Sequence, residues 1–323
     1  MYLGIDLGGT KIALGIIDEQ GLVHDSQRVP THRSRPFEAV VADIVTLGNR
    51  LIKSQPAGSV LGAGIGVPGP VDNVTGQIIN CINLGWKTVP IQDMLSEGLG
   101  LPTFAGNDAT MAGIAEFEAG VLRGVRTGVL LTLGTGIGGA VICEGQIQHG
   151  AHNIASEIGH MIVGENFYNC SCGRNGCLET FSSATALIKY TRRLLTGSSI
   201  SILPRGNSRN QHNRINGTMI FDAAKSGDPV ASRAVDRVAK YLAIGILNIV
   251  AVIDPERIVI GGGMSKAGDF FLEKIKKEAE HYRYFKEMPI GEIVYGKFGQ
   301  DAGLIGAGLY AGQRLGMLNK GKE

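Results

Sequence analysis

The sequence lacks a strong excess of either charge, a secretion signal and any long apolar run. Its 31 Lys and Arg against 29 Asp and Glu leave a formal net charge of +2, so bulk electrostatics gives no reason to expect nucleic acid or a membrane surface as a partner. Asp6 interrupts the first apolar segment too early for a signal peptide. The longest apolar stretch, 241–253, contains Asn248 and is shorter than the ~20 residues of a membrane span. We therefore expect a soluble, cytoplasmic protein.

Cysteine is also scarce. There are five, an odd number, and Cys170, Cys172 and Cys177 lie close together. In a reducing compartment such a cluster favours metal binding over disulfides. The sequence contains no G-x-x-x-x-G-K-[ST] segment, which excludes a standard P-loop.

Glycine and apolar residues are abundant. The chain has 323 residues, 48 of them glycine, and 44% are hydrophobic. This length suggests about two domains, with ample material for packed cores. Many glycines follow apolar runs in short clusters, where a backbone bends sharply or approaches a ligand closely.

Apolar periodicity predicts an alternating α/β chain. Strands are expected at 2–6, 11–18, 22–29, 60–67, 101–107, 128–133, 140–147 and 256–262. Helices are expected at 36–54, 92–100, 109–121, 218–252 (in two pieces, broken at 226–229), 265–282 and from 303 onward. Each half contains a strand, a Gly-rich turn and a return strand near its start, which indicates two related α/β domains facing a cleft.

The expected domain boundaries follow from this pattern. A small α/β domain would comprise 1–118, joined by the C-terminal helix 302–323, and a large α/β domain would comprise 119–301. Residues 180–221 contain no acidic side chain, and 196–217 have loop composition. We expect an exposed basic insertion there; a role in binding a partner or nucleotide stays open.

Two glycine-rich turns are candidates for phosphate binding. In 6–11 (DLGGTK) a strand delivers the Asp6 carboxylate, and two glycines then let backbone N–H groups approach a phosphate. Asp6 could hold Mg²⁺ through water. The alternative is an ordinary hairpin turn. In 134–139 (GTGIGG) the glycines precede a strand rather than a helix, so a phosphate-gripping hairpin turn is favoured over a dinucleotide fingerprint.

A third glycine cluster, 261–263, lies between a strand and a helix. It could offer a flat surface to a base or ribose, or serve close strand–helix packing. Asn107 and Asp108 end another strand. Helix capping is the structural explanation for Asp108, and a general base that accepts a hydroxyl proton is the functional one.

The most specific pattern runs from Glu157-x-x-His160 through Cys170-x-Cys172 to Cys177-x-Glu179. Three thiolates and one imidazole form a closed tetrahedral zinc set. The C-x-C spacing is tight, but Gly173 and Gly176 let the loop wrap around an ion. His149 and His152 are alternative ligands to His160.

Taken together, these motifs resemble the ROK family of sugar kinases and sugar-responsive repressors, and within it the zinc-containing bacterial glucokinases. The resemblance covers nearly the whole chain and rests on 6–11, 66–72 (GVPGPVD), 83–86 (NLGW), 107–109 (NDA), 133–139, 157–160 (EIGH) and 170–179 (CSCGRNGCLE). It implies a two-domain actin-like fold of the hexokinase and Hsp70 ATPase type, with sugar in the cleft and ATP at its mouth. The long basic loop is a departure from shorter members.

The resemblance also implies roles for individual residues. Sugar contacts would come from Gly69, Asn83, Asn107, Asp108, Glu157, His160 and Glu179. ATP phosphates and Mg²⁺ would be handled by Asp6, Gly8, Gly9, Thr10, Lys11, Gly134, Thr135, Gly136 and Gly138. The adenosine would lie against Gly262, Gly263 and Met264. A structural Zn²⁺ would be held by His160, Cys170, Cys172 and Cys177.

The expected activity is ATP-dependent phosphoryl transfer to the 6-hydroxyl of glucose, a glycolytic step, with Asp108 as general base. Mannose, fructose, N-acetylglucosamine and N-acetylmannosamine are alternative substrates. A sugar-sensing repressor would need a helix-turn-helix before the first strand, and a nicotinamide-dependent oxidoreductase is disfavoured by the strand after Gly139. We expect a homodimer or higher homo-oligomer, as in relatives.

Overall fold

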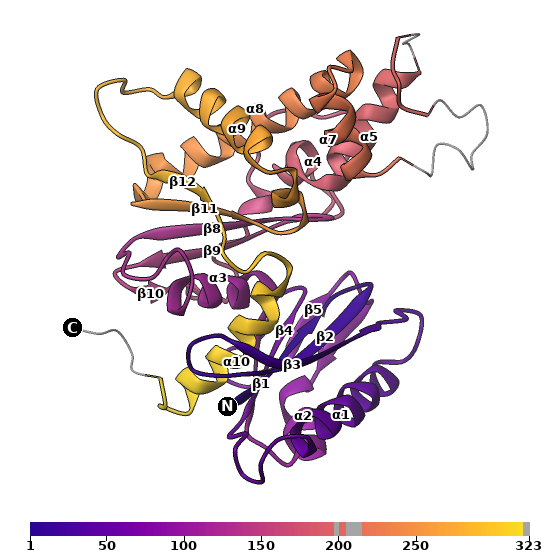
Figure 1. Cartoon of the computed structure of the whole chain (residues 1–323), viewed down its shortest axis with the longest axis vertical. Coiled ribbons are helices and arrows are strands. Elements are labelled where there is room, and N and C mark those ends of the chain that lie inside the picture. Colours follow the sequence, from indigo (N-terminus) through magenta and orange to yellow (C-terminus); the bar gives the residue numbers. More distant parts are fainter. Residues whose placement is uncertain (197–199, 205–214, 319–323) are drawn as a thin grey trace. The chain divides into compact units, whose positions relative to one another are not determined.

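The computed structural model describes residues 1–196, 200–204 and 215–318 (Figure 1). The chain forms two compact units. Unit 1 comprises Met1–Leu130, Gly139–Ser156 and the segment from Gly296 onward, and unit 2 comprises Leu131–Gly138 and Glu157–Tyr295. The domain boundaries expected from the sequence stay a prediction; the compact units place 119–130, 139–156 and 296–301 with the N-terminal strands.

Unit 1 is built on a five-stranded sheet of order β3-β2-β1-β4-β7. Its strands are β1 (Tyr2–Leu7), β2 (Lys11–Ile17), β3 (Val23–Pro30), β4 (Ala63–Val67) and β7 (Thr103–Asn107). The first three form the predicted antiparallel meander, and β4 and β7 add to β1 in parallel. A separate hairpin of β5 (Ile78–Cys81) and β6 (Trp86–Val89) was not predicted.

Helices cover both faces of this sheet (Figure 1). They are α1 (Phe37–Lys53), α2 (Ile91–Leu99), α3 (Asp108–Glu118) and α10 (Ala302–Arg314). Neighbouring residues of β1 face different helices. Leu3 points toward Gly48 of α1, and Gly4 faces α10 on the other side of the sheet. A Cβ on Gly4 would lie 2.1 Å from the Leu304 carbonyl oxygen, so α10 packs against β1 closely enough to require glycine there.

The second sheet has the order β10-β9-β8-β11-β12. Its strands are β8 (Gly128–Leu133), β9 (Ile137–Cys143), β10 (Gln146–Ile147), β11 (Arg257–Gly261) and β12 (Glu292–Tyr295). The single strand expected at 140–147 is wrong: β9 begins at Ile137, and the chain reverses at Glu144 and Gly145, both at positive φ. Gly138 and Gly139 therefore belong to a strand, and the turn is confined to 134–136.

The helices in the described part of unit 2 are α4 (Glu179–Ser182), α5 (Ala184–Leu195), α7 (Gly217–Lys225), α8 (Pro229–Ile253) and α9 (Asp269–Tyr282). The other four pack against α8 (Figure 1). The predicted break at 226–229 is confirmed: Asp228 accepts from the Ala231 N–H at 2.8 Å and Pro229 opens α8. The helix expected from 265 begins at Asp269 instead, because 263–267 form a 3₁₀ turn that ends at Gly268 with φ +69°.

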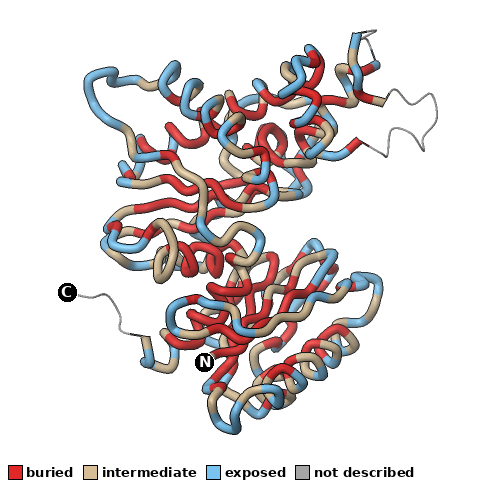
Figure 2. Tube along the Cα trace, viewed as in Figure 1, coloured by how far each residue is buried: buried red, intermediate tan, exposed pale blue. Residues whose placement is uncertain are grey.

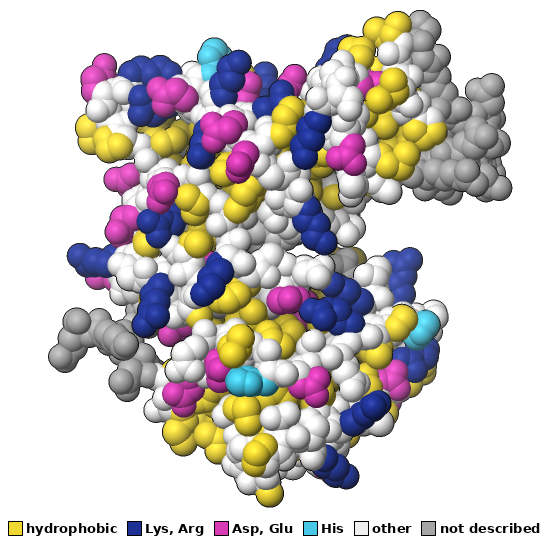
Figure 3. Space-filling view, viewed as in Figure 1, with side chains coloured by type: hydrophobic (Ala, Val, Ile, Leu, Met, Phe, Trp, Pro, Cys, Tyr) yellow, Lys and Arg dark blue, Asp and Glu magenta, His cyan; other side chains and the backbone are white. Residues whose placement is uncertain are grey.

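Each unit has its own core of buried strand and inner helix residues (Figure 2). On the face shown in Figure 3, positive and negative side chains are interspersed, in keeping with the small net charge. Among the described residues, no helix combines the length and apolarity needed to cross a bilayer. The basic insertion expected at 196–217 lies largely outside the described residues. Of this range, the structure describes only 196, 200–204 and 215–217.

Candidate functional site

The turn after β1 is a tight hairpin with Gly9 and Thr10 at its tip. The Gly8 N–H donates to the Lys11 carbonyl at 2.9 Å. Thr31 fixes this turn from β3, because its hydroxyl donates to the Gly8 carbonyl at 2.6 Å and its N–H donates to the Thr10 carbonyl at 3.0 Å. A Cβ on Gly9 would lie 3.6 Å from Cβ of Asn83, so two predicted site segments of unit 1 meet here.

Asp6 lies beside this turn in a desolvated position. Burial raises its pKa to about 6; Lys11 and Arg28 oppose the shift, and the Asp301 charge adds to it. Arg28 and Asp301 are ion-paired with each other. Gly303, near the start of α10, would place a Cβ 3.1 Å from the Asp6 carboxyl carbon. A carboxylate that is buried yet charged at neutral pH is a group that a divalent cation would stabilise, so Asp6 fits the expected Mg²⁺ role.

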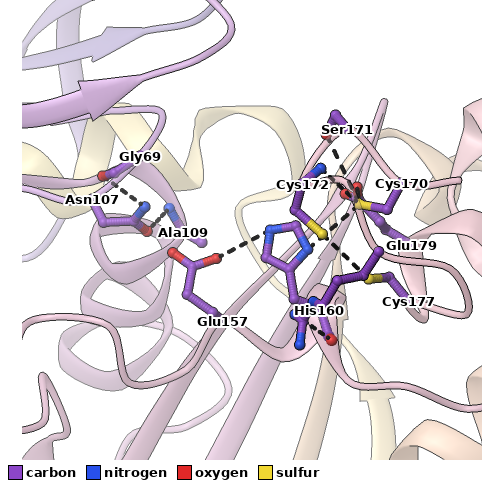
Figure 4. A network of polar contacts seen from close by, with 11 residues as sticks. Gly69, Asn107, Ala109, Glu157, His160, Cys170, Ser171, Cys172, Cys177 and Glu179 are labelled. Atoms are coloured by element: carbon purple, nitrogen blue, oxygen red, sulfur yellow. Dashed lines mark hydrogen bonds and ion pairs between the residues drawn. The ribbon is translucent and has the colours of Figure 1, made fainter. Parts of the chain in front are cut away.

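Asn107, not Asp108, caps helix α3, which corrects the structural explanation considered for Asp108. The Asn107 Oδ1 accepts from the N–H groups of Ala109 at 2.9 Å and Thr110 at 3.1 Å (Figure 4). Asp108 is the first helical residue, and its Oδ1 accepts from the Ala109 N–H at 2.8 Å. The carboxylate thus lies at the helix N-terminus, where the positive end of the helix dipole favours a negative charge.

Gly69 is held against Asn107. The Asn107 side-chain amide donates to the Gly69 carbonyl at 3.3 Å (Figure 4). Gly69 has φ +119°, and a Cβ there would lie 2.4 Å from the Asn80 carbonyl oxygen. No other residue fits this position. Gly69 and the Asn107–Asp108 pair therefore form one rigid segment of unit 1.

In unit 2 the turn between β8 and β9 is closed by the Gly134 N–H, which donates to the Gly136 carbonyl at 3.0 Å. The Ala184 N–H at the start of α5 donates to the Gly134 carbonyl at 2.9 Å. A Cβ on Gly134 would meet nothing within 4 Å, whereas one on Gly136 would lie 2.6 Å from Oε2 of Glu179. The predicted phosphate turn and a predicted sugar ligand are therefore in direct contact.

The 262–264 segment packs beside the same strand. Gly262 has φ +80°, and a Cβ there would lie 2.6 Å from the Leu133 carbonyl oxygen. Gly263 begins the 3₁₀ turn, and Met264 is buried. Close packing, one of the two explanations considered for these glycines, accounts for Gly262; a Cβ on Gly263 would meet nothing within 4 Å.

Four side chains of unit 2 form the predicted metal-ligand set. Ligand atoms of His160, Cys170, Cys172 and Cys177 all lie within 4.8 Å of one another. The Cys172 and Cys177 sulfurs are 3.6 Å apart, and the Cys170 sulfur is 3.6 Å from Nδ1 of His160 (Figure 4). Sulfurs at about 2.3 Å from a tetrahedral zinc ion lie roughly 3.8 Å apart, so the set fits zinc. His149 and His152, the alternative ligands, are not in this group.

His160 uses its two ring nitrogens toward different neighbours. Nδ1 faces the thiols, while Nε2 lies 4.0 Å from Oε2 of Glu157 (Figure 4). The Cys170 thiol donates to Oε1 of Glu179 at 2.9 Å. Both predicted sugar-binding carboxylates therefore lie next to the metal-ligand set: Glu157 is beside His160, and Glu179 contacts Cys170.

The three thiols differ in acidity. Hydrogen bonding, chiefly from the Arg174 N–H, lowers the pKa of Cys172 to about 6, whereas burial raises the pKa of Cys170 to about 12 and also raises that of Cys177. Binding of a metal requires thiolates, so loading the site must release protons, mainly from Cys170 and Cys177.

Two asparagines, Asn166 and Asn175, stabilise this loop and were not predicted from the sequence. The Asn166 N–H donates to Oδ1 of Asn175 at 2.8 Å, and the Asn175 amide donates back to the Asn166 carbonyl at 3.0 Å. The only signal in the sequence is the density of Asn around the cysteines, which is typical of irregular loops held by side-chain hydrogen bonds.

The two five-stranded sheets and the helices packed on them have the actin-like ATPase fold found in close structural neighbours. The chain belongs to the ROK family, whose model matches residues 2–314, and the family expected from the motifs is confirmed.

Three relatives illustrate the range of this similarity. A glucokinase of Halalkalibacterium halodurans is 35% identical over 100% of this chain and 98% of its own. A ROK family glucokinase from Streptomyces griseus, solved in complex with glucose and AMPPNP, superposes with a TM-score of 0.86 at 30% identity and covers 97% of this chain and 99% of its own. A xylose repressor of Caldicellulosiruptor bescii is 30% identical over 85% of this chain and 69% of its own.

Proposed function

We propose that this protein is an ATP-dependent glucokinase that phosphorylates the 6-hydroxyl of glucose with Asp108 as general base. The observation that carries the proposal is that Asn107 caps helix α3, while Asp108 is its first residue. Because Asn107 caps α3, the Asp108 carboxylate is not needed for that task. It is held at a helix N-terminus on a segment locked to Gly69. Full-length similarity to glucokinases supports the same activity.

Asp108 would orient the attacking hydroxyl and accept its proton as the oxygen bonds to the γ-phosphorus. Transfer needs charge neutralisation at the phosphates, which backbone N–H groups of the two glycine turns supply by direct donation. Mg²⁺, when bound near Asp6, supplies further positive charge to the phosphate oxygens. Lys11, at the end of the first turn, adds a cation at the same place.

We assign a structural Zn²⁺ to His160, Cys170, Cys172 and Cys177. Four protein ligands leave no open coordination position, so such an ion folds the loop and does not act on the sugar. Glu157 and Glu179 would accept hydrogen bonds from sugar hydroxyls, with help from Nε2 of His160. Thiolate formation removes the hydrogen bond that Cys170 gives to Glu179, so this carboxylate then has an acceptor available for a sugar hydroxyl.

An assay of ADP release tests the proposal. Glucose should give the highest kcat/KM in a panel with mannose, fructose, N-acetylglucosamine and N-acetylmannosamine. A different preferred hexose would keep the kinase and correct the substrate, whereas no sugar-dependent ADP release would refute the kinase. Elemental analysis should give about one zinc per chain. The cytoplasmic location and the homo-oligomeric state stay predictions.

A further inference from the structure

A cation lies among aromatic rings on the core side of the metal-binding loop, which we define as 166–180. Arg237 projects from α8, and its Cζ is 4.4 Å from the ring centroid of Tyr190, 4.7 Å from Phe181, 5.2 Å from Tyr241 and 6.0 Å from Phe167. These rings come from α5, α4, α8 and the loop itself. Rings at such distances attract a guanidinium through their quadrupoles.

The guanidinium has no carboxylate partner among the described residues. Its Nη1 is buried without a hydrogen-bond partner, and its Nη2 donates to Oδ1 of Asn166 at 3.0 Å. A desolvated cation with a single directional contact stabilises a fold poorly compared with an apolar side chain of similar size. The contact with Asn166 therefore explains why an arginine, and not an apolar side chain, occupies this position.

Asn166 joins three parts of the loop. Its N–H donates to Oδ1 of Asn175, which lies between Cys172 and Cys177. Its side-chain amide donates to the Thr180 carbonyl at 2.6 Å, directly after Glu179. The side chain can make these contacts only in one amide orientation, with Oδ1 toward α8. The Phe167 N–H donates to Oδ1 at 2.9 Å and favours the same orientation, and the Arg237 donor ties that oxygen to α8.

We propose that Arg237 is a positioning residue: by fixing Asn166, it holds the metal-binding loop in the geometry that keeps the zinc ligands and Glu179 in place. The proposal deepens the proposed function and rests on its zinc site. Lysine is a poor substitute here, because the planar guanidinium can stack between rings while one edge donates to Asn166, and an ammonium cannot.

The primary test measures zinc release to a colorimetric chelator from the metal-loaded full-length protein. Arg237→Met keeps the apolar stem but removes the donor, and we expect about tenfold faster release, the low end of the effect of outer-shell partners. The matched control is Arg193→Met: Arg193 stacks on the same Phe167 ring at 4.7 Å from α5, but no side-chain hydrogen bond links it to the loop. Its release rate should equal that of the wild type.

A double-mutant cycle separates positioning from general destabilisation. Asn166→Ala should release zinc at least as fast as Arg237→Met, because it also removes the bond to Thr180. The double variant should be no faster than Asn166→Ala, since Arg237 acts on the loop through Asn166. In steady-state kinetics, Arg237→Met should raise KM for glucose about tenfold and leave KM for ATP and kcat within about twofold, since the contacts made in the transition state are elsewhere.

Several outcomes would overturn the proposal. They are wild-type zinc release in folded Arg237→Met, additive effects in the cycle, or equal effects from Arg193→Met. If Arg237→Met does not fold, zinc release is measured for Arg237→Lys and Asn166→Ala instead. A wild-type release rate in both variants would refute the proposal. A wild-type protein that retains no zinc would instead refute the metal site itself, before any variant is made.

Discussion

The candidate site residues of the two units are held in place by different means. In unit 1, Asp6 ends a central strand and Asp108 starts a helix, so backbone hydrogen bonds of regular elements fix both. In unit 2, Glu157, His160 and Glu179 lie in or beside a loop that has little regular structure. Side-chain contacts hold this loop together with a few irregular backbone hydrogen bonds. A carboxylate near the end of a strand needs no ligand to stay in place, whereas this loop, on the zinc site proposed above, would depend on its metal and on braces such as Asn166.

The difference has an energetic cause. The loop buries Cys170, Cys177 and Leu178, but its Phe167 is 41% exposed and the neighbouring Ile162 is 60% exposed. Little apolar burial is available to offset the entropy of ordering it. Metal binding at the proposed zinc site would supply the missing free energy, because a site that forms only in the folded loop couples binding to folding. The following experiments test this contrast.

Asp108→Asn should have the largest effect. Loss of a general base lowers kcat by about 10²–10⁴, while glucose binding measured by calorimetry should change little. Stability should stay within about 1 kcal/mol, the size of a helix-dipole contribution. Asn107→Ala is the contrast: it removes the cap and should cost about 1 kcal/mol in the free energy of unfolding. Asp108→Asn with more than half of the wild-type kcat would contradict the assignment.

Cys172→Ala should abolish zinc retention, because outer-shell changes alone cost about 10–100-fold in metal affinity. Glucose binding should weaken as well, because Glu157 and Glu179 contact the ligand residues His160 and Cys170. Nucleotide affinity should fall much less than glucose affinity, since the first glycine turn and Asp6 belong to unit 1 and only the 134–136 turn touches Glu179 of this loop. Full activity in a metal-free preparation would show that the loop folds without help and would remove the contrast between the units.

In unit 1, Asp6→Asn should lower activity while it raises the stability of the ligand-free protein. Burial raises the folded-state pKa of Asp6 to about 6 from an ordinary value of 3.8, so the charged form destabilises the native state at neutral pH. Without nucleotide or Mg²⁺, the variant should be more stable than the wild type at pH 8, by up to about 3 kcal/mol.

This stability difference should shrink as the pH falls through 6 toward 4, because the native wild type takes up a proton before the unfolded chain does. Thermal unfolding of both proteins across pH 4–8 measures it, and a pH-independent difference would show that Asp6 is not desolvated. Activity of the variant should be low throughout if Asp6 serves the metal-bound phosphates.

The glycines of the 134–136 turn offer the smallest and most selective change. Gly136→Val, the simplest choice on sequence grounds, is a poor probe because a Cβ there would strike Glu179. Gly134→Ala adds a methyl group in open space and should raise KM for ATP about tenfold, about 1.4 kcal/mol of affinity, without affecting glucose binding. Gly136→Ala should impair both ligands. Equal effects of the two variants would mean that the turn is purely structural.

Sequence reasoning succeeded where the determinants are local. The meander, the break at Asp228–Pro229 and the strand that leads to Asn107 depend on turn chemistry and apolar periodicity within a few residues. The grouping of His160 with Cys170, Cys172 and Cys177 was also predictable, because the spacing of the thiols constrains it directly. The short β5–β6 hairpin was missed; it places Thr88 at φ +54°, a conformation that a β-branched residue seldom adopts and that no local pattern predicts.

Contacts between segments far apart in the chain were not predictable. No local pattern shows that Gly136 touches Glu179 or that Arg237 reaches Asn166. The cap itself illustrates the limit: Asn107 and Asp108 are both good capping residues, and the choice between them depends on where β7 ends. That point is set by pairing with β4, whose Val67 lies opposite Asn107.

The position of α10 has a consequence for biosynthesis. This helix, residues 302–314, packs on β1 and β4 of the N-terminal sheet, so the first strands to leave the ribosome cannot complete their core until nearly the last residues have emerged. At about 5–20 residues per second, that interval is roughly 15–60 s. Unit 2, which ends at Tyr295, can close earlier. The nascent N-terminal sheet is therefore the part of this chain that most needs protection by chaperones during translation.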